Sequence, residues 1–191
     1  MSSSSTLLMF MLGSMLLNGS STAENQRIQS IKTIEALLIN PPLREGETFY
    51  NYSFLDKDKV QRNIPYLAIR SNGIFIFEVI NTFGLIYGKK NDPLWYHSAP
   101  GQMNKTPFAN PTAMLNETAG SLSQLLEGKF PVIPLLVISQ SNHIAEDENP
   151  SLTSLQTFQR DILNHKEKVL PPEQIQEVKE ILEKSALKTQ N

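Results

Sequence analysis

Residues 73–81 read GIFIFEVIN, an almost wholly apolar run that carries one carboxylate, Glu78, near its end. A short apolar run bounded by turn residues is typical of a buried β-strand. A glutamate in such a strand is costly unless it is paired, hydrogen-bonded or bound to a metal ion. The stretch therefore predicts a central strand and makes Glu78 the first candidate site residue.

The segments around this run predict several more strands. Residues 66–70 (YLAIR) form a mostly apolar run and precede Ser71-Asn72-Gly73, which predicts a β-hairpin with an Asn-Gly turn. A third strand over residues 83–87 is predicted to pair with its neighbour. Further strands are predicted at residues 49–54, 94–96 and 130–138, and polar loops at residues 98–109 and 140–150.

Helices are predicted before, between and after these strands. Residues 24–38 place apolar side chains near one stripe, which is typical of an amphipathic helix. Asn110 and Pro111 suit the N-cap and first position of a helix whose buried face includes Met114. A last helix begins at Pro171-Pro172-Glu173, and residues 152–163 fit either a strand or a helix. This order predicts an α/β (α+β) fold with a mixed central β-sheet flanked by helices.

Length and composition fit a globular protein. The chain has 191 residues, 40% hydrophobic and 19% charged, which predicts one domain or one domain with terminal extensions. The net charge of −2 provides no global field that attracts nucleic acid. Local basic groups at Lys57/Lys59/Arg62 and Lys89/Lys90 are candidates for such binding, although solvated loop charges are the commoner case. The absence of cysteine excludes disulfides and thiolate chemistry.

The first 23 residues are predicted to be a separate segment. Residues 7–17, LLMFMLGSMLL, are too few to span a bilayer but suit the core of a secretory signal, with Ser21-Thr22-Ala23 as a cleavage site. No Lys or Arg precedes them, so a short membrane-associating segment or a packed hydrophobic helix is the alternative. We expect residues 24–187 to form the domain, and the chain to be membrane-associated through its N-terminus or secreted, with the cytoplasm as the alternative.

The alternation of side chains along a strand places Glu78 on the same face as Ile76 and Ile80. Many metal-dependent nucleases use this geometry: an acidic residue and a lysine two positions later lie side by side, and the preceding strand supplies another carboxylate. The carboxylates hold Mg²⁺, and the lysine orients or activates the attacking water.

Several segments match one family in order and spacing: residues 72–79 (NGIFIFEV), Asn81 with residues 84–88 (GLIYG), Trp95, Asn110-Pro111 and residues 170–173 (LPPE). From about Glu24 to Lys184 the chain resembles the nuclease-related domain (NERD) family of the PD-(D/E)xK nuclease-like superfamily. The resemblance implies a restriction-endonuclease-like core and an origin in metal-dependent nuclease chemistry. It also agrees with an N-terminal membrane segment, which the family often carries.

The family's site residues are only partly present. Pro65 stands where the family has the metal-binding aspartate, Ile80 where it has the lysine, and Met114 where it has a glutamine. Glu78 keeps the family's residue, and Glu24 loosely matches an acidic residue at the start of the domain. The resemblance therefore implies that Glu78 is the remaining catalytic residue and that Glu78 and Glu24 are the remaining metal ligands.

Three interpretations of function stay open at this point. The first is an inactive nuclease domain kept to bind nucleic acid or protein, with no cofactor. The second is a divergent Mg²⁺-dependent nuclease in which Asn63 or Asp58, together with Lys89 or Lys90, replaces the lost groups. The third is an interaction domain outside the cytoplasm that is unrelated to nucleic acid. From the residues alone, a carboxylate bonded to backbone or to a tyrosine also explains Glu78.

Overall fold

A five-stranded mixed sheet forms the centre of the domain in the computed structural model, which describes residues 23–80, 84–99, 101, 103–139, 141–144, 151–165 and 169–187. Its strands lie in the order β1 (Glu47–Leu55), β2 (Gln61–Arg70), β3 (Gly73–Ile80), β7 (Val132–Ile138) and β9 (Leu152–Ser154). The first three are antiparallel neighbours, whereas β7 runs parallel to both β3 and β9. The predicted mixed sheet is confirmed.

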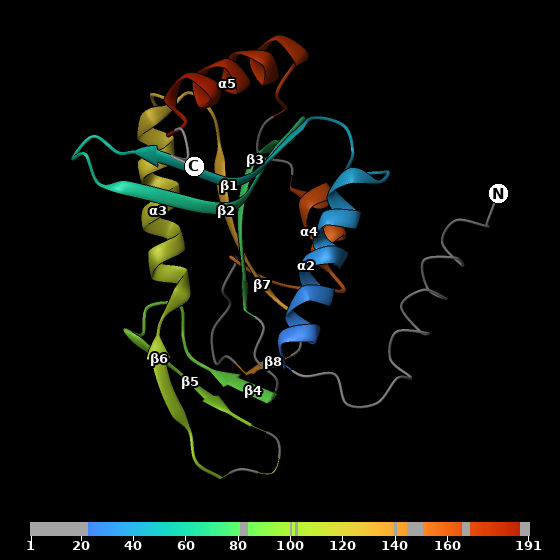
Figure 1. The fold of residues 1–191 in the computed structure, drawn as a ribbon, viewed down its shortest axis with the longest axis vertical. Helices are drawn as coiled ribbons and strands as arrows, with labels where there is room; N and C mark the ends of the chain where they lie inside the picture. The colour runs from blue at the N-terminus through green and yellow to red at the C-terminus, as the bar shows by residue number, and fades with distance from the viewer. Residues whose placement is uncertain are drawn as a thin grey trace, which may run out of the picture.

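Helices cover both faces of this sheet (Figure 1). One face packs on α3 (Pro111–Leu125) and α5 (Pro172–Ser185), and the other on α2 (Ala23–Ile39) and α4 (Phe158–Asn164). Strand β3 serves both layers because its side chains alternate: Ile74 and Ile76 join the α3 side, and Phe75 and Phe77 join the α2 side. All four side chains are fully buried. The predicted α/β (α+β) class is therefore confirmed.

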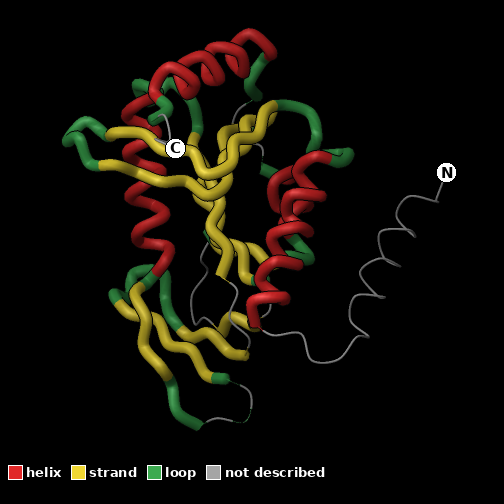
Figure 2. The backbone as a smooth tube through the Cα atoms, in the orientation of Figure 1, coloured by secondary structure: helices red, strands yellow, loops and turns green. Residues whose placement is uncertain are grey.

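A second, four-stranded sheet lies beyond one end of the first, at the N-terminal end of α3 (Figure 2). Its order is β6 (Thr106–Ala109), β5 (Leu94–Ser98), β4 (Gly84–Tyr87) and β8 (Ser141–Ile144). Ile86 and Trp95 of the second sheet are fully buried in the same hydrophobic cluster as the α3 side of the first sheet, so the two sheets share this core. Gly88 allows this packing, since a Cβ there would collide with the indole ring of Trp95.

The β2–β3 hairpin forms as predicted, with Arg70 opposite Gly73. Gly73 has φ of +145°, and a Cβ at this position would overlap the side chain of Ile133 in β7. Glycine is therefore required twice, by the backbone conformation and by the close approach of β7. The amide of Asn72 in the turn donates to the carbonyl oxygens of Ile162 (2.6 Å) and His165 (2.9 Å) at the end of α4.

The structure corrects several predictions about local elements. Strand β4 pairs with β5 and β8 in the second sheet, not with β3. The predicted loops at residues 98–109 and 140–150 contain β6 and β8, and the ambiguous segment at residues 152–163 is β9 followed by α4. For β6 and β8, pairing with β5 and β4 stabilises an extended conformation that the local sequence does not favour.

The N-terminal prediction lies largely outside the described residues, because the description begins at Ala23. Within the described part of the chain, no helix is both long enough and apolar enough to cross a membrane.

Asn110 joins the second sheet to α3. Its side-chain Nδ2 donates to the carbonyl oxygens of Lys90 (2.9 Å) and Asp92 (2.7 Å) in the β4–β5 turn. Its Oδ1 accepts from the backbone N–H (2.9 Å) and the hydroxyl (2.7 Å) of Thr112, which caps the helix as predicted. With both donors and both acceptor positions in use, one buried amide fixes where α3 begins relative to the second sheet.

Replacing Asn110 with alanine should lower the free energy of unfolding by about 2–4 kcal/mol, because it removes the helix cap and the hydrogen bonds to Lys90, Asp92 and Thr112. Asn110→Asp should be about as harmful at neutral pH, since it points a second acceptor at two carbonyl oxygens. Urea unfolding measures both variants. Asn116→Ala, at an exposed position of the same helix, is the control and should change stability by no more than about 0.5 kcal/mol. Equal effects of Asn110→Ala and Asn116→Ala would contradict the assignment.

Candidate functional site

A pocket of about 510 Å³ opens where the carboxyl end of β3 meets the start of α3 and the β5–β6 hairpin. In open α/β sheets, this end of the strands is where ligands commonly bind. The residues that line the pocket are Glu78, Ile80, His97, Thr106, Pro107, Phe108, Ala109, Pro111 and Met114. The lining is therefore mainly apolar, with one carboxylate, one imidazole and one hydroxyl.

Glu78 is half-buried and lies on the α3 side of β3, together with Ile76 and Ile80, as the alternation predicts. Among the described residues its carboxylate has neither a hydrogen bond nor an ion pair, so the backbone or tyrosine partner proposed from sequence is not found there. Burial raises the pKa of the Glu78 carboxyl above its ordinary value. Glu78 is thus a desolvated carboxyl that lacks a compensating partner within the described chain.

Pro65 directly precedes the last β2 residue that pairs with β3. The β2–β3 ladder runs from Arg70–Gly73 to Tyr66–Phe77, and the next pair in this register would be Pro65 with Glu78. Proline has no N–H to donate, and the ladder ends before it. On the β1 side, Asn51 has φ of +51° and is also left out of the ladder. The position that the resemblance assigns to an aspartate is therefore beside Glu78, but its residue offers no ligand.

Ile80 and Met114 line the same pocket as Glu78. The structure thus gathers the positions that the resemblance assigns to the lysine and the glutamine, although both side chains are now apolar. Met114 is 57% exposed, so its predicted place on the buried face of the helix is wrong. It belongs to the first turn of α3, which faces the pocket rather than the sheet.

Glu24, the second predicted metal ligand, belongs to the first turn of α2, and its side chain lies outside the described residues. Across the described residues, no group of three His, Asp or Glu side chains is placed to hold a metal ion. Mg²⁺ needs hard oxygen ligands in near-octahedral geometry, and Glu78 beside Pro65 and Ile80 supplies one carboxylate. The side chains that the structure describes do not fit the Mg²⁺ site that the family implies.

The residues suggested as replacements for the lost catalytic groups lie away from the pocket lining. Asn63 is exposed and accepts hydrogen bonds from the Ser53 hydroxyl (2.7 Å) and the Gln61 amide (3.0 Å). Asp58 belongs to the turn between β1 and β2. Lys89 and Lys90 belong to the β4–β5 turn, where their carbonyl oxygens accept from Trp95 and Asn110. None of these side chains is among those that line the pocket with Glu78.

Sequence reasoning missed the wall of the pocket that β5 and β6 provide. His97 is half-buried on β5 and lies opposite Thr106 of β6. Phe108 packs edge-on against Trp95, with ring centroids 6.4 Å apart. The one available signal was the aromatic residue in Thr106-Pro107-Phe108-Ala109. Pro107 argued against a strand there, because proline is tolerated in a strand only at an edge, and β6 is such an edge strand.

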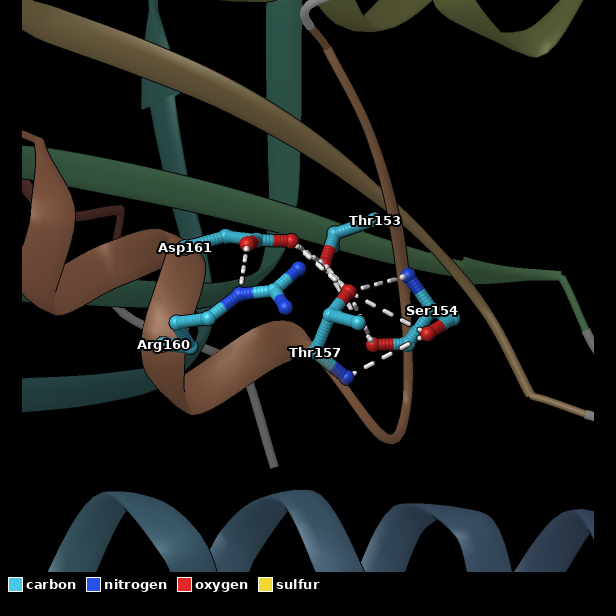
Figure 3. Close-up of polar contacts among 5 residues, drawn as sticks. All are labelled: Thr153, Ser154, Thr157, Arg160 and Asp161. Carbon is cyan, nitrogen blue, oxygen red and sulfur yellow. Dashed lines mark hydrogen bonds and ion pairs between the residues drawn. The ribbon is translucent and has the colours of Figure 1, made fainter.

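A second polar cluster lies where β9 turns into α4 (Figure 3). Asp161 Oδ2 accepts hydrogen bonds from the hydroxyls of Thr153 and Thr157, each at 2.7 Å, and Oδ1 accepts from Arg160 Nε at 3.2 Å. Burial raises the pKa of Asp161, but these hydrogen bonds outweigh it and leave the pKa below its ordinary value. The polar groups of this cluster bond to one another and stabilise the β9–α4 turn. We therefore assign the cluster a structural role.

The raised pKa of Glu78 has a consequence for stability. Because folding raises this pKa above 4.5, the native state binds the proton more tightly than the unfolded state. The stabilisation is present in full below pH 4.5 and is lost as pH rises through the native pKa. Glu78→Gln should therefore unfold at higher urea concentration than wild type at neutral pH, and this advantage should disappear on acidification. Glu183→Gln, at an exposed position of α5, is the matched control. An advantage of Glu78→Gln that is the same at every pH would contradict the raised pKa.

Comparison with known proteins agrees with this geometry. Residues 25–139 match the family model described as Nuclease-related domain (NERD), which is more than half of the chain. Searches of curated proteins and of solved structures find no match. The matched range contains β3, the β4–β5–β6 hairpins and α3, and hence every residue that lines the pocket. The chain therefore belongs to the nuclease-related domain family.

Proposed function

We propose that this nuclease-related domain no longer cleaves nucleic acid and acts as a binding domain for nucleic acid or protein. The observation that carries the proposal is the lining of the pocket. Glu78 keeps its family residue, but it meets Ile80 and Met114 in the pocket and Pro65 across the strand register.

The chemistry of these replacements supports inactivity. Isoleucine cannot place a positive charge beside a reacting phosphate, and proline cannot bind a cation with its side chain. Loss of one electrostatic element of an active site typically lowers the rate by about 10²–10³-fold. With the aspartate, the lysine and the glutamine all replaced, the inherited reaction should fall to the background rate. The runner-up, a divergent Mg²⁺-dependent nuclease, lacks a specific observation in its favour.

Several basic side chains are already paired with carboxylates, which weighs against nucleic acid as the partner. Arg62, from the first candidate basic group, is bound to Asp56 and Glu117, each at 2.8 Å. Lys129 and Lys179 are likewise paired, with Glu127 and Glu47. Phosphate recognition depends on unpaired basic side chains, and the net charge of the chain is −2. Residual binding to DNA would reveal itself by weakening as the salt concentration rises.

We also propose that the domain comprises residues 24–187, with residues 1–23 acting as a signal or membrane-associating segment. Support for the C-terminal boundary comes from α5, because Val178 and Leu182 are fully buried in the cluster on the α3 side. Tyr52 of β1 also donates a hydrogen bond to the carbonyl oxygen of Leu182 at 3.1 Å. The fold thus includes α5, which follows the matched residues 25–139.

A nuclease assay tests the proposed function. The purified protein is incubated with Mg²⁺ or Mn²⁺ and with single- and double-stranded DNA and RNA, and products are separated by gel electrophoresis. We expect no cleavage above the level of a metal-free sample. Cleavage by wild type that is lost in Glu78→Ala would overturn the proposal.

Restoring the family residues provides the matched variant for this assay. Pro65→Asp would place a second carboxylate across from Glu78, so it should bind Mn²⁺ more tightly than wild type in isothermal titration calorimetry. Adding Glu78→Gln to Pro65→Asp should remove the gain. If Pro65→Asp binds Mn²⁺ no better than wild type, Pro65 does not occupy the position of the missing aspartate.

A further inference from the structure

The pocket combines an apolar wall with one carboxyl group. Ile80, Phe108 and Met114 provide large apolar surfaces, and Glu78 is the one acidic residue among the described residues of the lining. A volume of about 510 Å³ lies within the range of pockets that hold small ligands or parts of a peptide. Neither carboxyl oxygen of Glu78 is used by another described residue. The pocket therefore offers apolar side chains beside two carboxyl oxygens that no other described residue uses.

A phosphate is a poor occupant of this pocket. No Lys or Arg is among the described residues that line it, and the Glu78 carboxylate repels an anion. The start of α3 does little to compensate, because Pro111 has no N–H and the N–H of Thr112 is already bonded to Asn110. The charge of the site selects for a cation.

Among cations, a guanidinium on an alkyl stem fits best. It is planar and can donate two parallel hydrogen bonds to one carboxylate, which would use both free oxygens of Glu78. It is also more weakly hydrated than an ammonium ion, so it loses less on entering a partly buried site. The three methylene groups of an arginine side chain can lie on Ile80 and Phe108, with Met114 at the rim.

We propose that the pocket binds an arginine side chain of a partner polypeptide, with its guanidinium on Glu78 and its stem against Ile80, Phe108 and Met114. The inference rests on the proposed function, because a site that held metal ions and phosphate could not accept this side chain. The arginine then supplies the positive charge that the family's lysine provides at the position of Ile80.

Blocked peptides test the inference with matched ligands. Acetyl-Gly-Arg-Gly-amide is compared with the same peptide carrying citrulline, which has the shape of arginine without its charge, and with the lysine peptide. Binding is followed by NMR through the methyl signals of Ile80 and Met114. We expect wild type to bind the arginine peptide about tenfold more tightly than the citrulline peptide, since a charge-assisted hydrogen bond is lost, with lysine between them.

Two variants separate charge from packing. Glu78→Gln should bind the arginine and citrulline peptides equally, whereas Glu183→Gln on the surface of α5 should keep the wild-type preference. Met114→Ala should weaken both peptides by the same factor, because it removes contact with the stem and leaves the carboxylate. Met114 is 57% exposed, so this variant is expected to fold.

The results distinguish the two proposals. A preference for arginine that survives in Glu78→Gln, equal binding of arginine and citrulline by wild type, or no binding of either peptide would overturn the arginine site. The same protein sample is assayed for cleavage of DNA with Mn²⁺. Cleavage that depends on Glu78 overturns the proposed function, whereas no cleavage together with no arginine preference overturns the arginine site alone.

Discussion

The hydrogen bonds of Asn110 are the constraint on which the arrangement of the site depends. One side chain bonds the β4–β5 turn through its amide nitrogen and the first turn of α3 through its oxygen. Ala109 and Pro111, its neighbours in the chain, both line the pocket. The distance between the β6 wall and the helical wall is therefore set by a buried amide that does not itself line the pocket. A substitution there would alter the pocket without changing any residue that contacts a ligand.

The central sheet supplies the other fixed reference. Strand β3 lies between an antiparallel neighbour and a parallel one, and its apolar side chains anchor both faces. Of the residues of β3, Glu78 and Ile80 line the pocket, and Glu78 is the first of them along the strand. The buried core residues of β3 are thus followed directly by its pocket-lining residues.

Local signals predicted the elements whose formation is decided locally. The Asn72-Gly73 turn, the Asn110-Pro111 helix start and the apolar run of β3 act through nearby backbone geometry, and each was predicted correctly. Strands β6 and β8 are short, contain polar residues or proline, and exist because β5 and β4 pair with them. Glu78, Ile80 and Met114 could be brought together by the family resemblance, whereas His97 and Thr106 could not, because their place follows from the β5–β6 pairing.

The edge position of β6 bears on how the site can diversify. This strand pairs with β5 on one side only, and within it Phe108 is held by Trp95 while Thr106, Pro107 and Ala109 are exposed. Exposed positions on an edge strand contribute little to the free energy of folding, so mutations there are tolerated. Substitutions at Thr106, Pro107 and Ala109 should therefore change the chemistry of one wall of the pocket at little cost in the free energy of folding.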